Sequence, residues 1–277
     1  MIHLTTRCQH RCAHCYVDFE RGDEPDMSDT LLDRVIAKCA AADLLGNVTL
    51  LGGEPFIDPP RLLSLIRKIW QTGSRTLEIF IPTNGRWVIR ADWEDIVREL
   101  VKLGQWFPYD LRVAFSENEW NMAQLGEQAP LVRERWRELE KHWPSIFSHR
   151  TLTKEELLPL GRAARNHLAE PARHVGVNCS FDDWYDPDAG GGFYTDYLAF
   201  YPDGSCGLCY VYHSPVIGRV EDDFTALLQK RREYLLALRQ HITGEPFGVL
   251  YPDACAECKK FYPQWLAEFS AQGPAAR

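Results

Sequence analysis

The residues best suited to metal chemistry are the cysteines, because seven of the nine in the chain fall into three tight groups. The groups are Cys8, Cys12 and Cys15, then Cys206 and Cys209, then Cys255 and Cys258. Structural disulfides are rare in reducing compartments, whereas thiolates at these spacings typically bind metal. We therefore expect the three groups to be metal ligands.

The first group has the spacing C-x3-C-x2-C. Thiolates are the preferred ligands of iron–sulfur clusters, and three of them leave one iron of a four-iron cluster without a protein ligand. An open coordination position separates a reactive metal centre from a structural one. The alternative is a zinc site in which His10 or His14 supplies a fourth ligand.

Two further motifs come directly after expected strands. The first consists of Gly52, Gly53, Glu54 and Pro55. Its glycines permit close backbone approach, its carboxylate suits a charge-assisted contact with an ammonium group, and its proline fixes the turn. The second is Pro82-Thr83-Asn84-Gly85, in which Asn-Gly is by itself a strong turn dipeptide.

In this order the motifs resemble those of the radical SAM superfamily, over roughly the first 170 residues. The resemblance implies a 4Fe-4S cluster on Cys8, Cys12 and Cys15, whose open iron chelates S-adenosylmethionine (SAM). Reductive cleavage of SAM then yields methionine and a 5′-deoxyadenosyl radical, which abstracts a substrate hydrogen. An electron donor such as flavodoxin or ferredoxin is expected as a partner.

The resemblance also implies a set of SAM contacts. Tyr16 matches the aromatic residue near the adenine, and Glu54, with the backbone of its motif, would hold the amino group. Ser116 occupies the place of a ribose contact, although Asn118 stands where aspartate is more usual. Arg133, like Arg135, follows at the distance of an arginine that meets the carboxylate, or is simply an exposed charge. The expected cofactor-binding residues are Tyr16, Gly52, Gly53, Glu54, Pro55, Asn84, Ser116 and Arg133.

Alternating strand and helix patterns must position these residues. Apolar runs predict strands at 2–5, 47–51, 76–82 and 111–115, and amphipathic patterns predict helices at 28–42, 60–71, 93–103, 124–140 and 154–168. Strand–helix repetition predicts a parallel sheet with its functional loops at the carboxyl ends of the strands. We expect an α/β fold, a partial (β/α)6 barrel over residues 1–170, with Cys39 in the core.

Residues 171–277 are expected to form a small α/β cluster-binding extension. A strand at 197–201, a Pro-Asp-Gly turn, a returning strand at 209–212 and a helix at 224–238 precede the last cysteine pair. This order resembles the twitch and SPASM extensions of radical SAM enzymes. It implies one auxiliary 4Fe-4S cluster on Cys206, Cys209, Cys255 and Cys258, with a zinc site or no metal as alternatives.

Cys179 stands apart from the three groups and has three interpretations. It is a buried core thiol, a cluster ligand in place of one of the others, or a hydrogen-atom donor that quenches a substrate radical, as in radical SAM epimerases. In the last case it would be catalytic.

Composition narrows the class of protein. The net charge is −8 with no basic stripe, which disfavours nucleic acid, and no apolar run approaches the length of a membrane span. The N-terminus is unlike a secretory signal, so we expect a cytoplasmic protein. The first strand begins at once, so no winged-helix domain for a leader peptide is expected ahead of it.

Three hypotheses for the function remain open. The first is maturation of a ribosomally made peptide by oxidation or crosslinking, with the auxiliary cluster as electron acceptor. The second is oxidation or epimerisation of a small molecule such as an aminocyclitol or sugar, similar to the twitch-containing 2-deoxy-scyllo-inosamine dehydrogenases. The third is a non-catalytic metal-binding scaffold, which leaves the SAM motifs without a role. We favour the first.

Overall fold

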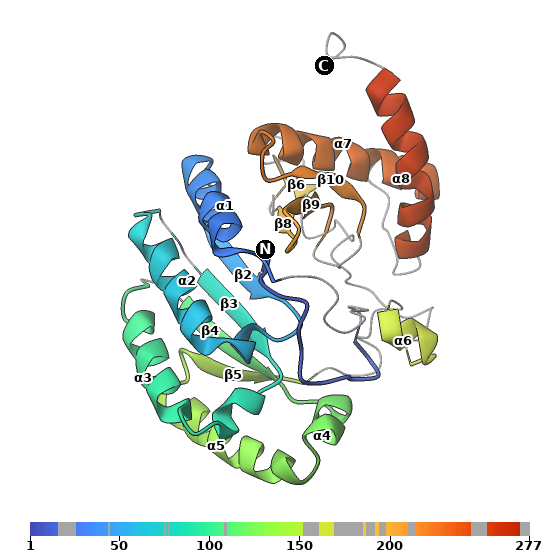
Figure 1. The fold of residues 1–277 in the computed structure, drawn as a ribbon. Coiled ribbons are helices and arrows are strands. Elements are labelled where there is room, and N and C mark those ends of the chain that lie inside the picture. The colour runs from blue at the N-terminus through green and yellow to red at the C-terminus, as the bar shows by residue number, and fades with distance from the viewer. Residues whose placement is uncertain are drawn as a thin grey trace.

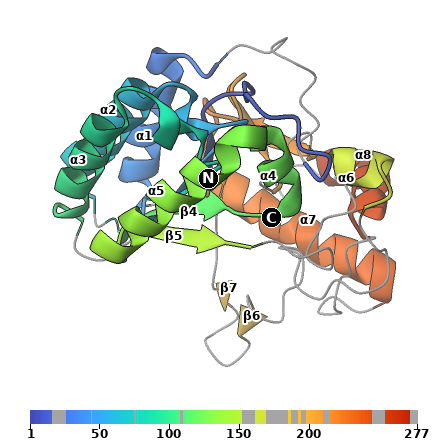
Figure 2. The same cartoon turned by 90° about the horizontal axis from the view of Figure 1, so that it is seen from below.

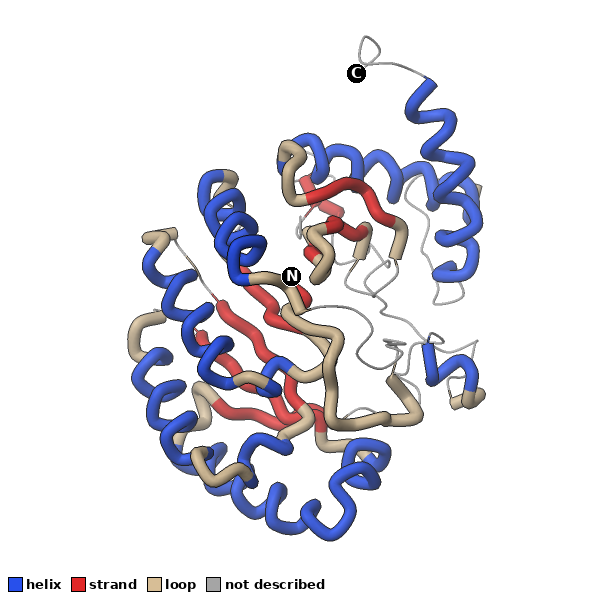
Figure 3. The backbone as a smooth tube through the Cα atoms, viewed as in Figure 1, coloured by secondary structure: helices blue, strands red, loops and turns tan. Residues whose placement is uncertain are grey.

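An eight-stranded sheet organises the chain, in the order β10-β9-β8-β1-β2-β3-β4-β5 (Figure 1). The computed structural model describes residues 1–15, 26–43, 45–74, 76, 78–107, 110–151, 161–168, 185–186, 192–193, 198–209, 214–244 and 254–271. Helices line the outer side of the sheet, and the strands lie inside them (Figure 3). The fold is thus mixed α/β with a partly parallel sheet, as predicted.

The first five strands pair in parallel, in chain order. They are β1 (Ile2–His3), β2 (Asn47–Leu51), β3 (Glu78–Thr83), β4 (Asp110–Ser116) and β5 (Phe147–Arg150). The sheet continues through β8 (Ala199–Phe200), β9 (Ser205–Gly207) and β10 (Val216–Arg219). A separate hairpin of β6 (Tyr185–Asp186) and β7 (Gly192–Phe193) projects from the main body (Figure 2).

The α-helices of the described residues follow the strands that they cover. They are α1 (Asp29–Ala41), α2 (Pro59–Gln71), α3 (Trp93–Gly104), α4 (Glu119–Leu125), α5 (Ala129–His142), α6 (Gly161–Arg165), α7 (Phe224–Thr243) and α8 (Ala254–Ala271). Three short 3-10 helices are η1 (Pro55–Ile57), η2 (Arg86–Ile89) and η3 (Gly126–Gln128). None of the described helices combines the length and apolar character that a bilayer span needs.

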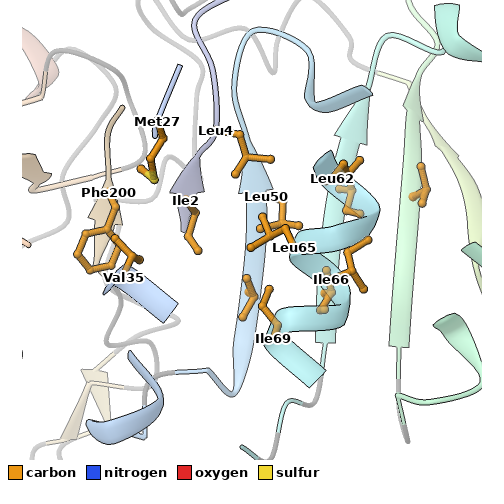
Figure 4. Packing of buried hydrophobic residues seen from close by; sticks show 14 of the residues in the cluster. Ile2, Leu4, Met27, Val35, Leu50, Leu62, Leu65, Ile66, Ile69 and Phe200 are labelled. Carbon is orange, nitrogen blue, oxygen red and sulfur yellow. The ribbon is translucent and has the colours of Figure 1, made fainter. Parts of the chain in front are cut away.

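Local sequence explains why these helices begin and what they bury. The hydroxyl of Ser28 accepts a hydrogen bond from Leu31 N at 3.2 Å, so Ser28 is the N-cap of α1. Helix α2 places apolar residues three and four apart, which forms a single stripe facing the sheet. That stripe packs beside Leu50 of β2 (Figure 4) and consists of Leu62, Leu65, Ile66 and Ile69, all almost fully buried.

The structure differs from the predicted elements in several places, including β1, which ends at His3 rather than residue 5, and α7, which continues to Thr243 rather than 238. Strand β5 was not predicted, because only Phe147 of its four residues is buried. The helix expected at 124–140 is broken at Gly126, whose φ of +55° interrupts α4 before α5 begins. The strand that returns from the C-terminal turn is β9 at 205–207 rather than 209–212, of which 210–212 lie outside the described residues.

The C-terminal strands extend the same sheet that carries the N-terminal motifs. Ile2 of β1 lies opposite Leu50 on one side and opposite Phe200 of β8 on the other, both in parallel. Phe200 is 1 % exposed and belongs to the same apolar core as Ile2. The expected boundary at residue 170 lies outside the described residues, but the sheet itself is continuous on either side of it.

We therefore expect Phe200→Ala to destabilise the whole protein by about 3–5 kcal/mol, through lost burial and the cavity that remains. Urea unfolding of the apoprotein, followed by circular dichroism and tryptophan fluorescence, should show one transition at a lower midpoint. Val216→Ala is the matched control, because Val216 is 46 % exposed on β10. Two separate transitions, with only one shifted by Phe200→Ala, would contradict a shared core.

Candidate active site

The loops that carry the predicted motifs meet at one edge of the sheet. The cysteine loop, residues 8–15, follows β1, and the Gly52-Gly53 turn follows β2. Asn84 follows β3, and Ser116 ends β4. Because the carboxyl ends of parallel neighbours lie together, the first four strands bring these motifs to a single site. In Figure 1 the cysteine loop runs in dark blue from β1 toward α6.

Backbone hydrogen bonds join the first two loops beyond the ends of their strands. Gly53 N donates to Thr5 O at 2.8 Å, and Glu54 N donates to Arg7 O at 2.9 Å. A Cβ atom on Gly53 would lie 2.3 Å from Arg7 O, and one on Gly52 would lie 2.8 Å from Thr5 O. Only glycine permits this approach, so the turn supports the segment that leads into the cysteines.

Glu54 joins the second motif to the third. Its side chain is 2 % exposed. Oε1 accepts hydrogen bonds from Thr83 Oγ1 at 2.7 Å and from Phe56 N at 3.0 Å, and Oε2 accepts one from Asn84 N at 2.7 Å. Burial raises the pKa of Glu54 to about 7, although these hydrogen bonds oppose the shift. The carboxylate thus fixes the turn after β3 as well as its own.

The turn after β3, which contains Asn84, contacts the first cysteine. Asn84 Oδ1 accepts a hydrogen bond from Arg86 N at 2.9 Å, and Asn84 Nδ2 lies 3.7 Å from Cys8 Sγ. His10 N donates to the same sulfur at 3.4 Å. N–H groups directed at cysteine sulfurs stabilise the thiolate form and tune iron–sulfur potentials. The surroundings of Cys8 therefore suit a cluster ligand.

Burial disfavours the ionised form of two thiols in the cysteine loop. Burial raises the pKa of Cys8 and of Cys12 to about 12, and the neighbouring Cys15 thiol contributes to both shifts. Ligand thiols must ionise, which a bound cation makes favourable. No three His, Cys, Asp or Glu side chains of the described residues gather closely enough for one metal ion.

Two described helices hold the cysteine loop from either side. From α6, Arg162 N donates to Cys15 O, and Asn166, just after this helix, donates to Ala13 O, both at 2.9 Å. From α4, Asn121 lies 2.6 Å from the His10 ring. Sequence reasoning missed Asn121, because a polar residue in a short helix gives no periodic signal. The one indication in the sequence that Asn121 points inward is its position three residues after Asn118, the N-cap of α4.

The other predicted SAM contacts have partners within the protein. Asn118 Oδ1 caps α4 by accepting from Asn121 N at 2.9 Å. Ser116 O accepts from Asn121 Nδ2 at 2.8 Å. Arg133 Nε donates to Glu117 Oε1 at 2.7 Å, and Arg135 lies over the Trp93 ring at 4.7 Å. Their roles toward SAM stay predictions, as does that of Pro55, which begins η1. Tyr16 lies outside the described residues.

Helix α7 contacts the segment of the first C-terminal cysteine pair and one cysteine of the second pair. Arg231 Nε donates to Leu208 O, between the first pair, at 2.9 Å. One helical turn later, Tyr234 Oη donates to Cys258 Sγ at 3.3 Å. The structure places Cys206 and Cys258 in the apolar core, and leaves Cys209 partly buried.

The predictions also concern Cys39, Cys179 and Cys255. Cys39 is 5 % exposed, so its predicted place in the core is confirmed. Cys179 lies outside the described residues, as does the side chain of Cys255.

The comparisons with known proteins agree with this geometry. Residues 2–122 match the Radical SAM superfamily. The protein is accordingly an enzyme, and the match implies a 4Fe-4S cluster and SAM. No curated protein sequence matches the chain.

Solved structures share the fold at low sequence identity. The structure of BtrN in complex with AdoMet and 2-DOIA is 14 % identical, with a TM-score of 0.57 over 84 % of this chain and 83 % of that one. Native anSMEcpe with bound AdoMet and Kp18Cys peptide is 13 % identical, with a TM-score of 0.53 over 90 % and 83 %.

We expect Gly53→Ala to abolish cluster binding at the cysteine loop, because the added Cβ forces the Arg7 backbone away. Iron per chain after anaerobic reconstitution should fall by about four, the content of one cubane cluster. Gly46→Ala is the matched control, since a Cβ there meets nothing within 4 Å. Full iron content in Gly53→Ala would show that the close approach is not needed.

A second prediction concerns the pH dependence of the apoprotein. Because the pKa of Glu54 is about 7 when folded and the usual value is 4.5, the folded state holds more protons between these values. The contribution of this group to the free energy of unfolding therefore falls as pH rises from 4.5 to 7. Urea unfolding across this range should show a shallower decline in Glu54→Gln. Equal slopes would mean that the carboxylate ionises as freely as in the unfolded chain.

Proposed function

We propose that this enzyme, whose residues 2–122 match the Radical SAM superfamily, cleaves SAM at a 4Fe-4S cluster held by Cys8, Cys12 and Cys15. The observation that carries the proposal is the meeting of three strand-end motifs at one edge of the sheet. When bound, the cluster supplies the electron that converts SAM to methionine and a 5′-deoxyadenosyl radical. Hydrogen abstraction from a substrate then follows.

The chain's own residues build and orient this site. Glycine at 52 and 53 brings the turn after β2 against the segment before Cys8. Glu54 anchors Asn84, which approaches the Cys8 sulfur. The buried carboxylate lies where an ammonium group of SAM would favour its charged form, since an opposite charge lowers a raised carboxyl pKa.

We further assign an auxiliary 4Fe-4S cluster to the C-terminal region, with Cys206, Cys209, Cys255 and Cys258 as its ligands. The support is α7, which contacts the segment of the first pair through Arg231 and Cys258 through Tyr234. Residues three apart on a helix share a face, and this supports a cluster location beside that face of α7. A cluster there would accept the electron that a substrate radical loses on oxidation.

Two substrate classes fit this arrangement. The fold is shared with anSMEcpe, whose structure holds a peptide, and this supports maturation of a ribosomally made peptide. It is shared equally with BtrN, whose structure holds 2-DOIA, and this supports oxidation of a small molecule. We favour the peptide as the substrate. Because its oxidation would use the auxiliary cluster as electron acceptor, Cys255→Ala should block product formation. A role for Cys179 as hydrogen donor belongs to the epimerase alternative.

The decisive experiment counts iron and tests SAM cleavage. Anaerobically reconstituted protein should hold about eight irons per chain, the sum of two cubane clusters. Cys8→Ala, Cys12→Ala and Cys15→Ala together should leave about four irons and abolish 5′-deoxyadenosine formation under reducing conditions.

Three results would each remove part of the proposal. Zinc in place of iron in the wild type would contradict both clusters. Loss of all iron in the triple variant would contradict the auxiliary cluster. Undiminished 5′-deoxyadenosine formation in that variant would contradict the assignment of the catalytic cysteines.

A further inference from the structure

Helix α4 contacts the cysteine loop through residues that separate the cysteines. Asn121 Oδ1 lies 2.6 Å from Nδ1 of His10, which stands between Cys8 and Cys12. Both partners are almost fully buried, at 1 % exposed for Asn121 and 3 % for His10. A buried hydrogen bond of this kind costs substantially when one partner is removed.

The amide of Asn121 is held in one orientation. Its Nδ2 donates to Asn84 O at 2.9 Å and to Ser116 O at 2.8 Å, so its Oδ1 must be the atom that faces His10. The His10 ring therefore donates from Nδ1. One side chain thus connects the cysteine loop with the ends of β3 and β4.

Two more residues of the same helix contact the loop. Gln124 Oε1 accepts a hydrogen bond from Arg11 N at 2.9 Å. The Trp120 ring lies against the His14 ring, with centroids 4.8 Å apart. Residues of α4 therefore contact both the segment between Cys8 and Cys12 and the segment between Cys12 and Cys15. None of these contacts involves a cysteine sulfur, so each leaves the ligands available.

We propose that α4 positions the cysteine loop for cluster binding, with Asn121 as its central positioning residue. The inference rests on the proposed function, because it assumes the cluster at Cys8, Cys12 and Cys15. Asn121 acts through His10, which it fixes against the neighbouring strand ends. Metal sites depend on such outer contacts as well as on the ligands themselves.

The experiment compares Asn121→Ala, Gln124→Ala and Glu119→Ala in the reconstituted full-length protein. Retention of the SAM-site cluster against an iron chelator should fall by about 10- to 100-fold in Asn121→Ala, the usual effect of losing an outer-shell partner. Its reduced cluster should also show a changed electron paramagnetic resonance (EPR) spectrum and a weaker response to added SAM. Gln124→Ala should show a smaller loss, and Glu119→Ala, exposed on the same helix, should match the wild type.

Further variants separate positioning from general stability. If Asn121 acts through His10, the variant that combines His10→Ala with Asn121→Ala should lose no more cluster than Asn121→Ala alone. Full additivity of the two losses would overturn that link. If Asn121→Ala fails to fold, Gln124→Ala provides the test, because Gln124 is exposed. Chelator resistance and an EPR spectrum of Gln124→Ala equal to those of Glu119→Ala would overturn the proposal. A wild type without a SAM-responsive cluster would instead overturn the proposed function.

Discussion

The site depends on a backbone contact that leaves no room for a side chain. The Gly52-Gly53 turn lies directly against residues 5–7, and its amides continue the pairing of β1 with β2 after both strands have ended. The cysteine loop therefore leaves the sheet from a supported position, although β1 itself has only two residues. Without that contact, a loop carrying three thiols would depend on the contacts that α4 and α6 make with it.

Buried polar side chains continue this support from strand to strand. Glu54 connects the ends of β2 and β3, and Asn121 connects β3, β4 and the cysteine loop. Each such group must be paired, because an unpaired polar atom inside a protein costs more than a hydrogen bond gains. The network thus specifies one arrangement of the four loops. Such preorganisation holds ligands in place before a metal group binds.

Sequence predicted most of what local pattern can encode. Strand β2 was predicted to the residue, because 47–51 is a short apolar run, and α2 began within one residue of its expected start, because its apolar stripe is regular. The cysteine spacing and the glycine turn predicted the candidate site, and the structure brings their two loops into contact. In contrast, β5 has one buried residue among four, and the break at Gly126 depends on its positive φ. The position of Asn121 follows from tertiary contacts that no local pattern records.

The pairing of β1 with β8 has a consequence for biosynthesis. Strand β1 lies beside β8 in the sheet but precedes it far in the chain, so its partner Phe200 is synthesised much later. Contacts so distant in sequence form slowly and only after the intervening chain is available. In a nascent chain that has emerged only as far as β5, β1 can pair with β2 but not yet with β8. The strand that leads into the cysteine loop is therefore paired on both sides only after β8 has been synthesised.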